Sequence, residues 1–168
     1  KAFYIAKSGR PGPVLIDITK DAQFEMFDFN YSKVTGIRSY KPVPKPQISS
    51  LNLAADLINN ASKPMIVWGQ GVILSEAEKE FLTFVEKTGI PAAWTIMGVS
   101  AIPTSHPLNV GMVGMHGNYA PNMLTNECDL LVAIGMRFDD RVTGNLDKYA
   151  KQAKVIHFEI DPAEINKN

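Results

Sequence analysis

The chain has 168 residues, of which 45% are hydrophobic and 20% are charged. This composition is typical of a folded domain and excludes a disordered chain. Its 17 Lys and Arg residues balance 17 Asp and Glu residues, so it lacks the excess of positive charge that nucleic-acid binding requires. The apolar runs are too short to cross a bilayer. Cys128 is the only cysteine, so no internal disulfide can form, and we expect a cytoplasmic protein with no nucleic-acid or membrane partner.

The first 20 residues predict a small piece of another domain. KAFYIAKSG indicates the last turns of a helix that is closed by Gly9. After a turn at residues 10–13, residues 14–18 (VLIDI) predict a short buried strand. A helix, a turn and a strand cannot form a core, so we assign residues 1–20 to the C-terminal end of a preceding domain. Because Lys1 is not an initiating residue, we expect the chain to begin inside a larger protein.

Residues 21–46 predict a linker, since they show no sustained hydrophobic period. Pro42, Pro44 and Pro46 alternate with other residues, which favours an extended and semi-rigid chain. We therefore place a domain boundary here and expect a central domain over residues 47–168.

After the linker, strands alternate with helices. We expect strands at residues 65–68, 91–95, 130–134 and 155–160, and helices with apolar stripes at 48–58, 77–89 and just after 119. Ser75 and Glu78 have the spacing of a capping box, and Asp161-Pro162 begins a further helix. The alternation predicts an α/β fold: a Rossmann-like, doubly wound parallel sheet in three α/β/α layers.

Each predicted strand ends in residues suited to a ligand. Gly69-Gln70-Gly71, Thr95 to Gly98, Gly135 with Arg137, and Glu159 with Asp161 should meet at one edge of a parallel sheet. Glycines allow close approach of the backbone, arginines bind phosphate, and an acid can accept from ribose hydroxyls. Residues 114–117, before a helix, could direct backbone N–H groups at an anion. Together these features indicate a dinucleotide site.

Structural explanations remain open for the same residues. The usual G-x-G-x-x-G fingerprint is absent. Arg137, Asp140 and Arg141 could form an ion-pair network, His116 could be a hydrogen-bonded structural residue, and Met97 and Met115 could fill gaps in the core. Cys128 is expected to be a packing residue. No catalytic triad and no metal-ligand spacing is present, so we assign no catalytic residue and no metal ligand.

Five segments carry a resemblance to a known family: SGRPGPVLIDITKD, TIMG, GMVGMHG, RFDDRVTG and FEIDPAEINKN. They resemble the large catalytic subunit of acetohydroxyacid synthase, also called acetolactate synthase. Members of that family have a pyrimidine-binding, a central and a pyrophosphate-binding domain, and the chain resembles the end of the first, the linker and the central domain. The family joins two 2-oxoacids, pyruvate with pyruvate or 2-oxobutyrate, with loss of CO2, in isoleucine and valine biosynthesis.

The resemblance implies that the central domain binds FAD, whereas thiamine diphosphate and Mg²⁺ are bound by the other two domains. It therefore implies that the fragment alone is inactive. Gln70 and Glu159 depart from the residues common in the family. Lys20, Asp140 and Arg141 match positions that line an inhibitor and substrate channel. The positions that match flavin contacts are Arg10, Gly69, Gly71, Thr95, Met97, Gly114, Met115, His116, Gly135, Arg137, Arg141, Glu159 and Ile160.

The resemblance also implies partners: the remaining domains of the same chain, a homodimer or tetramer of the full enzyme, and a small regulatory subunit. Two alternatives stay open. The chain could come from another FAD-bearing enzyme of the superfamily, such as glyoxylate carboligase or pyruvate oxidase, although RFDDRVTG favours acetolactate synthase. It could also be a structural scaffold whose nucleotide pocket binds nothing.

Overall fold

The computed structural model describes all 168 residues and divides them into two compact units, Lys1–Lys45 and Pro46–Asn168. The first unit contains two short helices, α1 (Ala2–Lys7) and α2 (Lys20–Phe24). Tyr40 folds back on the end of α1: its hydroxyl donates to the Ser8 carbonyl at 2.9 Å, and its ring meets Tyr4 edge-on at 6.2 Å. Gly9 follows the helix with a φ of +63°, as the predicted helix end requires.

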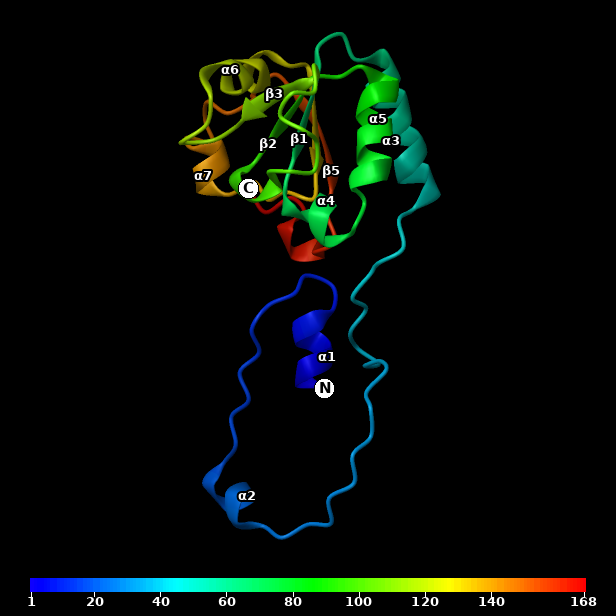
Figure 1. The fold of residues 1–168 in the computed structure, drawn as a ribbon, viewed down its shortest axis with the longest axis vertical. Coiled ribbons are helices and arrows are strands. Elements are labelled where there is room, and N and C mark those ends of the chain that lie inside the picture. Colours follow the sequence, from blue (N-terminus) through cyan, green and yellow to red (C-terminus); the bar gives the residue numbers. More distant parts are fainter. The chain divides into compact units, whose positions relative to one another are not determined.

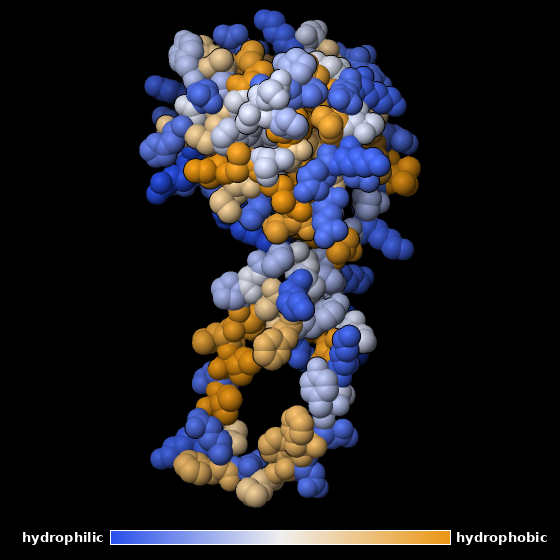
Figure 2. All heavy atoms as spheres, in the orientation of Figure 1, coloured by the Kyte–Doolittle hydropathy of each residue, from blue (hydrophilic) through white to orange (hydrophobic).

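The strand predicted over residues 14–18 is wrong. These residues belong to no strand, and Leu15 is 93% exposed. A strand requires a hydrogen-bonded neighbour, and the first unit offers no sheet; its single isolated bridge joins Ile37 to Tyr40. Many of its apolar side chains lie on the surface, as Figure 2 shows.

The second unit is built on a five-stranded parallel sheet, which confirms the predicted fold class. The order of the strands is β3-β2-β1-β4-β5, and every neighbouring pair is parallel. The strands are β1 (Pro64–Trp68), β2 (Ala92–Trp94), β3 (Asn109–Met112), β4 (Leu130–Ile134) and β5 (Lys154–Phe158).

Helices cover both faces of the sheet (Figure 1). Helices α3 (Ile48–Asn60) and α5 (Glu78–Thr88) lie on one face. Helices α6 (Tyr119–Glu127) and α7 (Asp140–Thr143) lie on the other. This is the three-layer arrangement expected from alternating strands and helices. None of the helices combines the length and hydrophobicity needed to cross a membrane.

The two central strands are buried from both sides. Ile66 and Val67 of β1 and Leu131 and Val132 of β4 are all 0% exposed. Ile66 and Val132 contribute to the core beneath α3 and α5, while Val67 and Leu131 contribute to the core on the opposite face. Burial on both faces explains why these strands are continuous apolar runs rather than alternating patterns.

Several details of the second unit differ from the predictions. The capping box is wrong: the Ser75 hydroxyl donates backward to the Gly71 carbonyl at 2.7 Å, and α5 begins at Glu78 without a side-chain cap. On α3, Ala54 is buried as predicted, but Ile48 is 68% exposed. The predicted end of α5 is confirmed, since Gly89 has a φ of +67°.

Short elements at the ends of the strands were not predicted. They are the helix α4 (Gln70–Leu74) after β1, the 3-10 turn η1 (Ile96–Gly98) after β2, and α7 after β4. The predicted helix start at Asp161 is confirmed, but the helix is a single 3-10 turn, η2 (Pro162–Glu164). The Asp161 carboxylate accepts a hydrogen bond from the Ala163 N–H at the start of this turn.

Candidate ligand site at the carboxyl edge of the sheet

The strand order reverses between β1 and β4. From β1 the chain continues outward through β2 to β3, and it then crosses to β4 and β5 on the other side. In open α/β sheets this point, at the carboxyl ends of the strands, forms the ligand crevice. It is flanked here by residues 69–71 after β1 and 135–139 after β4. The structure therefore brings the predicted strand-end residues of the second unit to one edge.

The glycines of the two central loops pack against each other. The Gly69 N–H donates to the Ile134 carbonyl at 3.0 Å, and the Gly71 N–H donates to the Gly135 carbonyl at 2.9 Å. A Cβ on Gly69 would lie 2.6 Å from the Gly135 oxygen, and one on Gly71 would lie 2.5 Å from the Gly135 Cα. Contact between the two loops thus requires these glycines even without a ligand.

The turn after β2 presents apolar side chains outward. The Thr95 N–H donates to the Trp68 carbonyl at 2.9 Å, and the buried Trp68 indole Nε1–H donates to the Gly98 carbonyl at 2.8 Å. These two bonds fix η1 on the end of β1. Ile96 is 67% exposed and Met97 is 56% exposed. Met97 is therefore a surface residue at this edge, and the core-filling explanation for it is wrong.

The loop between β3 and α6 is held by its own hydrogen bonds. Asn122 accepts from the Gly114 N–H at 2.9 Å and donates to the Gly114 carbonyl at 3.0 Å. The Met115 N–H donates to the Arg141 carbonyl at 2.8 Å, and the Gly117 N–H donates to the Gly114 carbonyl at 2.9 Å. Three of the four backbone N–H groups in this loop are therefore engaged within the protein, which argues against the predicted backbone anion site.

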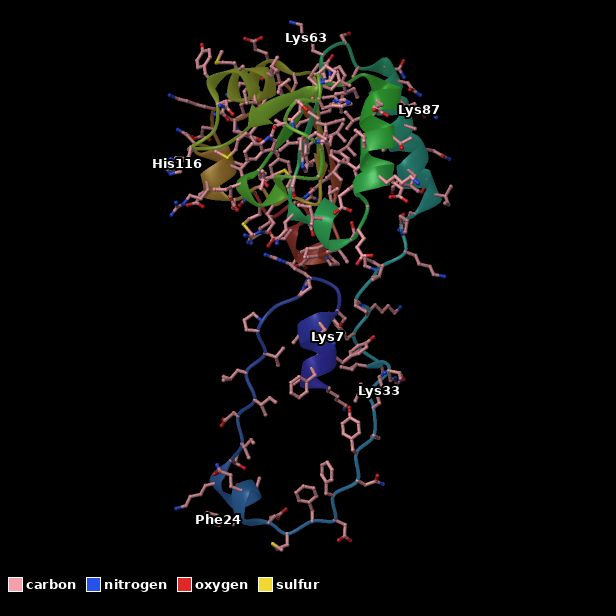
Figure 3. The ribbon with its side chains drawn as sticks, in the orientation of Figure 1. Lys7, Phe24, Lys33, Lys63, Lys87 and His116 are labelled. Atoms are coloured by element: carbon pink, nitrogen blue, oxygen red, sulfur yellow. The ribbon has the colours of Figure 1, made fainter.

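The side chains of the same loop point outward. Met115 is 63% exposed, so it does not fill the core either. His116 is exposed and extends from the loop beside α7 (Figure 3). The loop can thus present one apolar and one polar side chain to a ligand.

Arg137 forms an ion pair with Asp139 rather than with Asp140. The Nη2 and Oδ2 atoms are 3.6 Å apart, and the two side chains are 47% and 37% exposed. Asp139 is the N-cap of α7, where its carboxylate accepts from the Val142 N–H at 3.2 Å. Asp140 and Arg141 are exposed in the first turn of α7. An exposed pair of this kind is weak, so the guanidinium remains available to an anionic ligand.

Glu159 is more deeply buried than an acid that accepts hydrogen bonds from ribose hydroxyls needs to be. Its side chain is 7% exposed, and its Oε1 accepts from the N–H groups of Ile160 at 2.9 Å and Asp161 at 3.1 Å. The carboxylate therefore fixes the loop after β5. Ile160 is 37% exposed at the same edge.

Arg10 and Lys20 belong to the first unit. Arg10 follows α1, and Lys20 is the first residue of α2; both are exposed.

The edge of the second unit carries a group of exposed apolar side chains that come from different loops. Figure 2 shows hydrophobic residues exposed in the region where α4 lies in Figure 1. No group of three or more His, Cys, Asp or Glu side chains is placed to hold a metal ion. The apolar group consists of Ile96, Met97, Val99, Met115 and Ile160.

Sequence reasoning missed several residues that hold the site together. Trp68, Asn122 and His157 each bond to a loop at the carboxyl edge. The sequence marks Asp139 as a possible helix cap, because a carboxylate preceding a short polar turn is typical of an N-cap. The bonds of Trp68, Asn122 and His157 span 8 to 30 residues, and no short repeating pattern indicates their partners.

Two groups with shifted pKa values, Cys128 and Asp129, lie at the opposite edge, just before β4. Burial and the neighbouring Asp129 charge raise the pKa of the Cys128 thiol to about 11. Cys128 is 2% exposed, so its predicted role as a packing residue is confirmed. A hydrogen bond from the Ser62 N–H lowers the pKa of the Asp129 carboxyl. These shifts reflect the packing of the amino edge and mark no catalytic group.

Comparison with known proteins identifies the family of the chain. Residues 51–168 match the family model described as thiamine pyrophosphate enzyme, central domain. The acetolactate synthase of Mycobacterium leprae is 49% identical over 168 residues, which cover 100% of this chain and 27% of that protein. The acetolactate synthase large subunit of Corynebacterium glutamicum is 47% identical over 167 residues, which cover 99% and 27%.

An archaeal relative gives the same result. The probable acetolactate synthase large subunit of Methanocaldococcus jannaschii is 46% identical over 170 residues, covering 99% of this chain and 29% of that protein. The chain thus spans little more than a quarter of the length of these relatives. By this match and by its parallel sheet, the chain belongs to the family of thiamine pyrophosphate enzyme central domains.

Proposed function

We propose that the chain is the FAD-binding central domain of an acetolactate synthase large subunit. The observation that carries this proposal is the identity of 46% to 49% with proteins of that name over 99% to 100% of the chain. The full-length protein would join pyruvate to a second pyruvate or to 2-oxobutyrate on thiamine diphosphate, with release of CO2. Mg²⁺ and thiamine diphosphate would be held by sequence outside this chain, which contributes no catalytic residue.

The carboxyl edge of the sheet fits FAD in its chemistry. The isoalloxazine ring is flat and largely apolar, and Met97 and Met115 are exposed apolar side chains from two neighbouring loops. The pyrophosphate is anionic, and Arg137 offers a half-exposed planar guanidinium. Arg141 and His116 add exposed donors nearby in the fold. When bound, the flavin would supply a redox-active ring with no net redox role in the overall reaction.

The remaining residues of the proposed contact set have different roles. Thr95 and Gly114 are buried in loops that hold the neighbouring methionines. Glu159 would act by fixing the backbone that presents Ile160. The glycines at 69, 71 and 135 would allow the central loops to pack closely enough to leave the edge open. We also propose Arg10 as a contact, and Lys20, Asp140 and Arg141 as residues of an inhibitor and substrate channel.

A scaffold without bound FAD is the second candidate, and one observation favours it. Gly69, Gly71 and Gly135 are required by contacts within the protein, so their presence does not demand a ligand. The two proposals differ in their prediction for the half-exposed Arg137 and for the exposed apolar group: a scaffold uses neither.

We propose further that the full-length protein works in the cytoplasm as a homodimer or tetramer with a small regulatory subunit. The test of function is an acetolactate assay on the full-length protein with pyruvate, thiamine diphosphate and Mg²⁺, with and without FAD. We expect turnover that requires all three cofactors, and none from residues 1–168 alone. Turnover that is unaffected by complete removal of FAD would favour the scaffold, and no turnover of pyruvate would contradict the proposed activity.

A further inference from the structure

His157 joins two loops of the carboxyl edge. It lies in β5, and its Nε2 is 2.8 Å from the carbonyl oxygen of Met136, in the loop after β4. A carbonyl oxygen can only accept a hydrogen bond, so Nε2 carries the hydrogen and donates it. When neutral, His157 is therefore the Nε2–H tautomer.

The imidazole also packs against Phe138, the residue that follows Arg137 in the sequence. Its ring meets Phe138 edge-on, with centroids 5.1 Å apart, and Phe138 in turn meets Tyr149 at 6.3 Å. The His157 side chain is 11% exposed. His157 thus contacts the residue immediately before Arg137 and the residue immediately after it.

Glu159 stabilises this arrangement from the neighbouring loop. Its Oε2 lies 3.9 Å from His157 Nε2, beyond hydrogen-bond distance. Its Oε1 accepts from two backbone N–H groups of the loop after β5. The Gly135 N–H, which donates to the Phe158 carbonyl at 2.8 Å, links the same two loops.

We propose that His157 is a positioning residue that holds the backbone on both sides of Arg137, so that the guanidinium is presented to an anionic group in a fixed direction. The proposal rests on the proposed function, since the anionic group is the pyrophosphate of FAD. Arg137 itself is half-exposed and bound only by one weak ion pair. A fixed backbone lowers the ordering cost of placing such a side chain, and this raises affinity without any new contact to the ligand.

Two substitutions separate positioning from simple loss of stability. His157→Leu fills the same space but cannot donate to the Met136 carbonyl, whereas His157→Gln retains an N–H donor at similar reach. Val85→Ala is the control, since Val85 is fully buried in α5 against the opposite face of the sheet. We expect His157→Leu to speed amide hydrogen exchange at residues 135–139 without ligand and to weaken FAD binding by the full-length protein roughly tenfold.

His157→Gln should restore slow exchange and most of the affinity, and Val85→Ala should change neither measurement. A double substitution adds a second criterion: if His157 acts through Arg137, His157→Leu combined with Arg137→Ala should bind FAD no more weakly than Arg137→Ala alone. Additive losses, or unchanged exchange at residues 135–139 in His157→Leu, would overturn the proposal. If the wild-type protein bound no FAD, the proposed function would fail, while the exchange measurement would still decide whether His157 holds the loop.

Discussion

Gly71 and Gly135 meet backbone to backbone where the strand order reverses: the Gly71 N–H donates to the Gly135 carbonyl at 2.9 Å, and a Cβ on Gly71 would lie 2.5 Å from the Gly135 Cα. Because the obstructing atoms are main chain, a larger residue cannot be accommodated by a rotamer change. The contact joins the helix after β1 to the loop after β4, so it sets the geometry of the whole carboxyl edge.

Gly71→Ala should therefore destabilise the protein by about 3 kcal/mol, the upper range for forcing extra atoms into a packed site. Gly89→Ala is the matched control, since Gly89 has a φ of +67° and nothing within 4 Å of an added Cβ. It should cost about 1 kcal/mol, from backbone strain alone. Urea unfolding of both variants measures the difference, and a smaller cost at Gly71 than at Gly89 would show that the loops can separate.

The amino edge offers a second prediction, at Asp129. Its carboxylate accepts from the Ser62 N–H at 2.7 Å and the Lys63 N–H at 2.9 Å, which joins the starts of β4 and β1. Lys63 lies at the end of the second unit opposite α4 (Figure 3). Asp129→Asn, which loses the charge and one acceptor, should lower the melting temperature at pH 7. Asp56→Asn, on the exposed side of α3, should not.

The sign of the pH dependence follows from the lowered pKa of Asp129. A carboxyl whose pKa is lower in the folded state stabilises the fold above its unfolded value, near 3.8, and loses that contribution as the pH falls through the folded value. The difference in melting temperature between wild type and Asp129→Asn should therefore shrink below pH 4. A difference that stays constant down to pH 2 would contradict the assigned hydrogen bonds.

Cys128 gives the opposite dependence. Burial raises the pKa of its thiol from 9.0 to about 11, so the folded state holds the proton more tightly than the unfolded state. Its contribution to stability is complete below pH 9 and is lost as the pH rises toward 11. Cys128→Ala should lose less stability than wild type between pH 9 and pH 11 in chemical unfolding. Parallel losses in both proteins would show that the thiol is not the group responsible.

Patterns in the sequence predicted the helices and strands that depend on residues close together in the sequence. The apolar runs of β1 and β4 and the stop of α5 at Gly89 follow from burial and from backbone conformation. The same kind of pattern failed at residues 14–18, because an apolar run becomes a strand only beside another strand. Strand β3 was missed because Asn109 and Gly111 interrupt its hydrophobicity at the edge of the sheet.

The sequence predicted that the strand-end residues of the second unit lie at one edge of the sheet, but it did not predict their contacts. The parallel sheet alone brings the residues that follow each strand to one edge, so the sequence was enough to group Arg137 with Glu159. Whether a carboxylate is free depends on the backbone around it, and Glu159 proves to be engaged with two N–H groups. His157 makes its bond across 21 residues, a distance over which no periodicity in the sequence is informative.

Arg137 provides the sharpest test of a binding residue. Arg137→Ala should weaken FAD binding by the full-length protein by about 1.5 to 3 kcal/mol if the guanidinium pairs with phosphate. Arg137→Lys should recover only part of the loss, since an ammonium lacks the planar fork. Asp139→Asn keeps the helix cap and removes the competing charge, so it should not weaken binding. Flavin fluorescence titration measures all three, and an unchanged affinity in Arg137→Ala would assign that residue to the ion pair alone.

We propose that this domain binds FAD at the carboxyl edge of its sheet. The most direct measurement is the visible absorption spectrum of the purified full-length protein after incubation with FAD and removal of free flavin by gel filtration. We expect flavin absorption to co-elute with the protein at about one flavin per chain, and to fall sharply for Arg137→Ala. A folded wild-type protein that elutes without flavin at saturating FAD would contradict the claim and favour the scaffold.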